Sequence, residues 1–297
     1  MAPAPFGGQA VVEGVMIRGQ RHLAVAVRAP DGEVVLTDAP IGGGGALRWR
    51  RVPFVRGLIV LAESLSMGMR ALRWSTAVAE QGPSAQLPAG RLPAGPMLAL
   101  ALAIFCVPVL LTFWVGWVTG SEYSEVVAEG LARVALLAGY VALLGSVPEF
   151  ARLFAYHGAE HRAIHAWEHG RALTVAEVRA FPNAHARCGT AFLLTLGVLA
   201  GVVFLFFGAP PFWLRLLERL FLAPVIAALA YEVLRLSQRY AGVAVVAWIF
   251  RPNLWMQRLT TRDPDDAQIE VAIAALERAV ALEAAEPATA RVAEPLS

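Results

Sequence analysis

The sequence predicts a mainly α-helical, polytopic integral membrane protein with about four spans and a small N-terminal β-rich unit. Of its 297 residues, 57% are hydrophobic and only 16% are charged. Soluble domains carry roughly 25% charged residues, so the composition is typical of a membrane protein. Several uncharged runs approach the length needed to cross a bilayer, so the lipid bilayer is a predicted partner. The net charge of +2 offers no basic field for nucleic acid, and a nucleic-acid partner is excluded.

Residues 1–45 are predicted to form the β-rich unit. The runs 10–19, 22–29 and 32–38 are short and rich in β-branched residues, as strands are. Asp31-Gly32 is a suitable turn between the last two runs.

The next unit, residues 46–95, combines a helix with a linker. Residues 48–75 have helical apolar spacing with arginines at both ends, which predicts a helix that lies flat on a membrane or packs against it. Residues 81–96 are rich in proline and glycine and are predicted to be a linker.

A transmembrane domain is predicted over residues 96–258. Its clearest span is the uncharged run 96–118, and the others are predicted at 131–148, 188–208 and 212–234. The apolar run 241–250 is too short to span and is predicted to be re-entrant or interfacial.

The last unit, residues 259–297, is predicted to be a C-terminal helix and tail. Asp263 is the expected N-cap and Pro264 the first helical residue, with the helix running to about Glu283.

Arginines in the loops predict the orientation. The connection 149–187, which includes a histidine-rich helix, has five arginines, whereas 119–130 has three glutamates and no base. Because basic loops stay in the cytoplasm, this connection and both termini are predicted to be cytoplasmic. The protein is then a multi-pass protein of the inner (cytoplasmic) membrane. Arg215 and Arg219 lie on the opposite side in this topology and count against it.

The chemistry-bearing residues are concentrated in one segment, because five of the six histidines lie between residues 157 and 185. His157, His161, His165 and His169 are four residues apart. On a helix each advances by roughly 40° and about 6 Å, so that neighbouring pairs can share one ion.

His157 to His161 also spell H-x-x-E-H, the inverted zinc-peptidase arrangement. In that chemistry two neutral imidazoles bind the metal, and the intervening carboxylate, here Glu160, acts as the catalytic base. His185 and Cys188 follow at a spacing that suits zinc and are candidates for the third ligand, as is His165. Imidazole and thiolate ligands favour zinc as the divalent metal over calcium or magnesium.

A histidine-rich helix also has a simpler interpretation. Its imidazoles can be solvated at a membrane surface, or they can form hydrogen bonds with Glu160 and Glu168. His169 and His22 are expected to have such structural or surface roles.

Five motifs resemble one known family. They are residues 7–19, 156–168, 185–193, 231–235 and 259–276, and together they resemble the YqhQ-type bacterial membrane proteins. The resemblance covers residues 7 to 280 and implies a metal-dependent enzyme without an established reaction. The implied site residues are His157, Glu160, His161, His165, His185 and Cys188, with Gln9, Glu13 and Arg18 nearby. Where some members have a lysine after the Glu-His pair, this chain has Arg162, which preserves the charge.

Two functions are compatible with these residues. One is a membrane-bound, zinc-dependent hydrolase, with a peptidase as the candidate class, in which Glu160 is the base. The other is a non-catalytic membrane assembly or regulatory protein, in which four protein ligands close a structural metal site.

Overall fold

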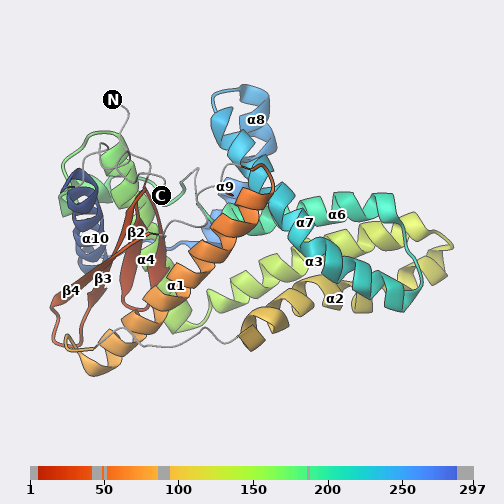
Figure 1. Cartoon of the computed structure of the whole chain (residues 1–297), viewed down its shortest axis with the longest axis horizontal. Helices are drawn as coiled ribbons and strands as arrows, with labels where there is room; N and C mark the ends of the chain where they lie inside the picture. The colour runs from red at the N-terminus through yellow and green to blue at the C-terminus, as the bar shows by residue number, and fades with distance from the viewer. Residues whose placement is uncertain (1–5, 42–48, 50–51, 86–93, 186–187, 286–297) are drawn as a thin grey trace, which may run out of the picture.

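A computed structural model describes residues 6–41, 49, 52–85, 94–185 and 188–285, with the backbone alone for residues 94–105. Residues 86–93 of the expected linker lie outside this description. Figure 1 shows a β-sheet flanked by helices at one end of the molecule and a bundle of long helices at the other. The predicted combination of a small N-terminal sheet with a mainly helical chain is confirmed.

The sheet is antiparallel and its strands follow chain order. They are β1 (Gly7–Val11), β2 (Gly14–Arg18), β3 (His22–Arg28) and β4 (Val34–Pro40). The expected single run 10–19 is divided, because Val12 and Glu13 form a two-residue turn between Val11 and Gly14. Glu13 has a φ of 51°, in the left-handed region that usually selects glycine or asparagine. Because the turn contains neither glycine nor asparagine, its sequence did not predict it.

Alternate side chains of each strand point to opposite sides of the sheet, and helices cover both of its faces. Ala24 and Ala26 face a core shared with α4 (Pro148–Glu168) and α10 (Asp266–Ala285). Leu23 and Val25 face the other core, which α1 (Val55–Gln81) covers. The histidine-rich helix α4 and the C-terminal helix α10 therefore pack on the N-terminal sheet.

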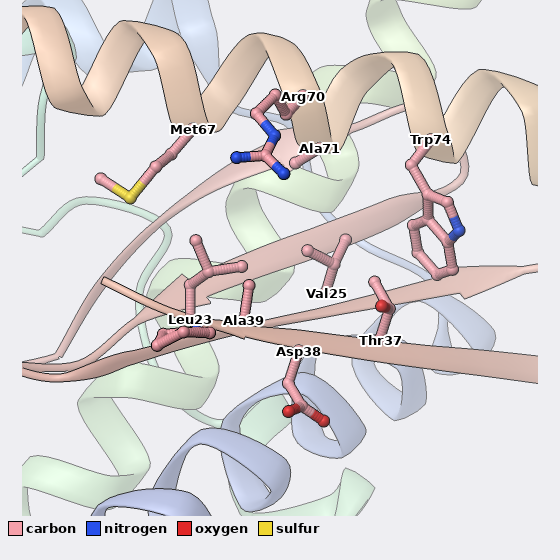
Figure 2. Close-up of a pocket in the computed structure, with 10 residues that line it drawn as sticks. Leu23, Val25, Thr37, Asp38, Ala39, Met67, Arg70, Ala71 and Trp74 are labelled. Carbon is pink, nitrogen blue, oxygen red and sulfur yellow. The ribbon is translucent and has the colours of Figure 1, made fainter. Parts of the chain in front are cut away.

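A small cavity of about 60 Å³ lies between this sheet and α1. Figure 2 shows Met67 of α1 above Leu23 of β3 and Trp74 above Thr37, whereas Asp38 points away from α1. On that far side Asp38 pairs with Arg278 of α10, at 2.7 Å. The cavity has room for a water or two and is a packing gap between the two layers.

The long helices form the apolar bundle. They are α2 (Ala94–Thr119), α3 (Glu122–Leu144), α6 (Thr190–Phe207) and α7 (Phe212–Arg239). Of the described helices, α3, α6 and α7 are long and apolar enough to cross a membrane, and Cys106–Thr119 of α2 is a shorter apolar helix. Trp117 and Phe206 are 88% and 86% exposed. Large apolar side chains exposed in this number indicate a lipid environment.

The second expected span, 131–148, is shifted and extended in the structure. Helix α3 begins at Glu122, with Ser121 as its N-cap, and ends before Pro148, which starts α4. The acidic segment expected to be a loop is therefore helical. Its buried acids are neutralised by α7: Glu125 pairs with Arg215, and Glu129 pairs with Arg219 at 3.0 Å. The two arginines that count against the sequence-based topology are thus bound in buried ion pairs.

The C-terminal segment contains α8 (Ala244–Ile249), α9 (Arg251–Thr260) and α10. Residues 241–250 therefore provide only a short helix. The expected N-cap Asp263 is wrong: Asp265 and Gln268 form a reciprocal capping box, at 2.8 and 3.0 Å. Asp263 instead accepts a hydrogen bond from Asn183, at 2.9 Å.

Candidate metal site

Helix α4 aligns the histidines. It begins with Pro148 in its first turn, where the missing N–H costs nothing, and ends before Gly170, whose φ is +64°. Because the helix packs between the sheet and the segment 181–185, the centre of its histidine face is buried. His157 is 9% exposed and His161 is 1% exposed.

Three side chains converge at the centre of this face. His157, His161 and Cys188 each offer a ligand atom, and these atoms lie within 4.8 Å of one another. Cys188 Sγ lies 3.2 Å from His157 Nε2. The spacing of four residues places the two imidazoles together, whereas Cys188 enters from the segment before α6.

The other ring nitrogen of each imidazole contacts a backbone carbonyl. His157 Nδ1 lies 2.8 Å from Thr260 O, and His161 Nδ1 contacts Asn183 O. Carbonyls accept hydrogen bonds, so Nδ1 carries the proton and Nε2 has the lone pair. Such a contact to the outer nitrogen is the usual support of a metal-ligating histidine.

Glu160 lies beside the two lone pairs. Its Oε2 is 3.9 Å from His157 Nε2 and 3.7 Å from His161 Nε2. This oxygen is buried and has no hydrogen-bond partner among the described residues. Burial raises the pKa of Glu160 to about 8, and the nearby His157 opposes this effect. An orphaned buried carboxylate oxygen between two imidazole lone pairs fits a bound cation.

Burial also determines the charge state of the neighbouring groups. It lowers the pKa of His161 to about 2, with an added effect of His157, and it raises the pKa of the Cys188 thiol. His161 is therefore a neutral imidazole at physiological pH, which is the form that binds a metal.

A second group of possible ligands adjoins the first. His165, Glu168 and His185 also have ligand atoms within 4.8 Å of one another. Burial lowers the pKa of His185 to about 4, with His165 contributing. The structure thus divides the expected ligands: Cys188 joins His157 and His161, whereas His185 joins His165.

Several residues lie around these groups that the sequence pattern did not indicate. Gln257 of α9 is 1% exposed and holds the backbone of His185 through two hydrogen bonds, both of 2.9 Å. Asn183 and Thr260 provide the carbonyls described above. Nothing in the local sequence distinguishes them, because they act through backbone atoms or from a distant helix. Glu232, which lies near the end of the span expected at 212–234, pairs with Arg56 and belongs to neither ligand group.

The N-terminal hairpin packs directly on α4. Gly8 lies so close to Glu160 that an added Cβ would be 2.9 Å from its Cγ. Glu13 binds Arg152 and accepts a 3.2 Å hydrogen bond from the Tyr156 hydroxyl. Arg152 and Tyr156 lie on the two turns of α4 before Glu160. The hairpin therefore covers the site.

Gln9 and Arg18, which the resemblance places near the site, lie on the other face of the sheet. Gln9 lies against Gly68 of α1. Arg18 donates to Ser64, at 2.8 Å, and pairs with Glu63. Both residues therefore contact α1.

A cavity of about 390 Å³ reaches the second group. It is lined by His165, Glu168 and His185, and by apolar residues of α7, α8 and α9 that include Leu234, Val246 and Leu254. The first group is enclosed, whereas the second has space in front of it.

Comparisons with known proteins support the resemblance. The family model described as "Protein of unknown function (DUF1385)" matches residues 52–282. "Uncharacterized protein YqhQ" of Bacillus subtilis (strain 168) is 32% identical over 299 residues, which cover 95% of this chain and 94% of that protein. No solved structure matches the chain. The predicted similarity to YqhQ-type proteins is confirmed, and neither description states a reaction or a ligand.

Proposed function

We propose that this chain, which belongs to the DUF1385 family of proteins of unknown function, is a membrane-bound, metal-dependent hydrolase. Its metal ligands are His157, His161 and Cys188, and Glu160 is its general base. The observation that carries the proposal is the convergence of two imidazole lone pairs and a thiol beside a buried carboxylate oxygen without a partner.

The donor set favours zinc, because imidazole and thiolate ligands suit that ion. When bound, a zinc ion would activate water or polarise a substrate carbonyl. The three proposed ligands leave Glu160 free to take the proton from the attacking water. Burial raises the pKa of Glu160 to about 8, and a cation bound beside it would lower that pKa towards neutrality. Proton transfer is most effective when the pKa of the base lies near the working pH.

The second candidate function is a non-catalytic assembly or regulatory protein with a structural metal. The burial of the site favours it, because Glu160 is 3% exposed and Cys188 8% exposed. With Glu160 as a fourth ligand, the site would be closed to substrate. The cavity in front of His165, Glu168 and His185 supports the catalytic alternative, since it provides space for a substrate close to the first group, whose His161 ring is 5.7 Å from that of His185.

Metal analysis is the first test. The full chain, purified in detergent, is expected to retain one equivalent of zinc at this group. His161→Ala should lose that equivalent, because two remaining ligands hold zinc weakly. Inductively coupled plasma mass spectrometry measures the zinc per chain. His169→Ala is the matched control, since His169 is exposed at the end of the same helix. Equal zinc contents in His161→Ala and wild type would contradict the proposed site.

We further propose a four-span topology in the cytoplasmic membrane, with α2, α3, α6 and α7 as spans. The sheet, α4 and both termini are then cytoplasmic, in agreement with the five arginines of residues 149–187. Because Arg215 and Arg219 are paired with buried glutamates, they do not act as free positive charges.

Reporter fusions test this topology. A fusion after Gly120, between α2 and α3, should give an extracytoplasmic signal. Fusions after residues 175 and 285 should both give cytoplasmic signals. Alkaline phosphatase and green fluorescent protein serve as the paired reporters, because each is active on one side only. An extracytoplasmic signal at residue 175 would invert the topology and place the site on the other side.

A further inference from the structure

The second ligand group does not take part in the proposed first site. His165 and Glu168 lie on the last turns of α4, and His185 lies on the segment before α6. The ligand atoms of the three are within 4.8 Å of one another, and His185 Nε2 is 3.3 Å from Glu168 Oε2. This arrangement brings two imidazoles and one carboxylate within reach of a single ion.

The surrounding contacts hold this group in place. His165 Nε2 lies 2.8 Å from Ala184 O, so that nitrogen is a donor and the other has the lone pair. The buried amide of Gln257 binds both the N–H and the carbonyl of His185. A rigid backbone on one ligand and a carbonyl contact on another are the supports that metal ligands usually have.

We propose that His165, Glu168 and His185 bind a second divalent transition-metal ion. Two imidazoles and a carboxylate provide nitrogen and oxygen ligands, a set that suits zinc, iron or cobalt. The site differs from the first in two respects: it contains no thiolate, and it faces the cavity of about 390 Å³. A cation there has coordination positions open towards the cavity.

The two sites are neighbours. The rings of His161 and His185 are 5.7 Å apart between centroids, and those of His165 and His185 are 4.6 Å apart. A cation at the second site would bind a carbonyl or anionic oxygen of a substrate in the cavity. This role in substrate binding rests on the proposed function, whereas binding of the ion does not.

Cobalt titration tests the second site separately from the first. Full-length protein in detergent is stripped with a chelator and titrated with Co²⁺, and bound cobalt is measured after gel filtration. Cobalt bound by a thiolate absorbs strongly in the near ultraviolet, so absorption there reports the first site alone. Wild type is expected to bind two ions per chain. Glu168→Gln should bind one and keep the thiolate absorption, and His165→Gln should do the same.

Glu177→Gln is the matched control, because Glu177 is an exposed carboxylate on the connection after α4, and this variant should bind two ions. Cys188→Ser should lose the thiolate absorption while the second site still binds cobalt. A single ion in wild type that Glu168→Gln still binds, or two ions in both Glu168→Gln and His165→Gln, would overturn the second site. If wild type shows no thiolate absorption but loses an ion in Glu168→Gln, the second site stands and the proposed hydrolase site fails.

Discussion

Glu129→Gln is expected to lower the free energy of unfolding by about 3–5 kcal/mol, the cost of breaking a buried ion pair. Glu129 is 1% exposed and accepts hydrogen bonds from Arg133, at 2.7 Å, and from Arg219, at 3.0 Å. Both arginines are buried as well, at 3% and 0% exposure. Glutamine preserves the shape of the side chain but leaves two adjacent buried cations without the carboxylate between them.

Unfolding by sodium dodecyl sulfate in mixed micelles, followed by circular dichroism, measures this loss. Glu122→Gln is the matched control, because it is the same substitution at an exposed position on the same helix. An acid in the first turn contributes about 0.3–1 kcal/mol through the helix dipole, so the control should change stability little. Equal losses in the two variants would show that the buried ion pairs do not hold α3 against α7.

Glu160→Gln is expected to retain the metal and to reduce hydrolytic activity by a factor of about 10²–10⁴, the usual contribution of a general base. The three proposed ligands remain, so zinc binding does not depend on the carboxylate. Glutamine has a similar size but cannot accept the proton. Activity is measured with fluorescently labelled casein and by complementation of a strain that lacks the protein.

Glu149→Gln provides the control, since Glu149 is exposed in the first turn of α4. It should retain both metal and activity. If Glu160→Gln keeps its zinc and complements fully, the catalytic interpretation fails and the structural metal site remains. If Glu160→Gln loses its zinc, Glu160 is a ligand and a different residue must act as the base.

Local sequence patterns predicted the elements whose formation depends on nearby residues. The uncharged runs predicted the apolar helices, because every backbone polar group inside a bilayer must be satisfied within the segment. The period of four among the histidines placed His157 and His161 on one face of α4. Asp31 and Gly32 marked the turn between β3 and β4, where Gly32 has a φ of 89°.

The sequence was misleading where a distant partner determines the local structure. Glu125 and Glu129 are typical of a loop between two spans, yet both lie inside α3. They are tolerated there because Arg215 and Arg219 of α7 neutralise them, and that pairing joins residues 90 positions apart. The local sequence around Glu125 and Glu129 does not predict these pairs. A buried carboxylate needs a compensating charge, and here that charge comes from a helix distant in the sequence.

The same distinction applies to the site. The sequence by itself determined which side chains are able to bind a metal, because that depends on residue type and helical spacing. Only the tertiary structure decided that Cys188 joins His157 and His161 whereas His185 joins His165 and Glu168. The connection after α4 turns back over the helix, and the two hydrogen bonds from Gln257 fix where His185 lies along it. Ligand groups assembled from separate segments depend on such long-range contacts, which the spacing of residues along the chain does not specify.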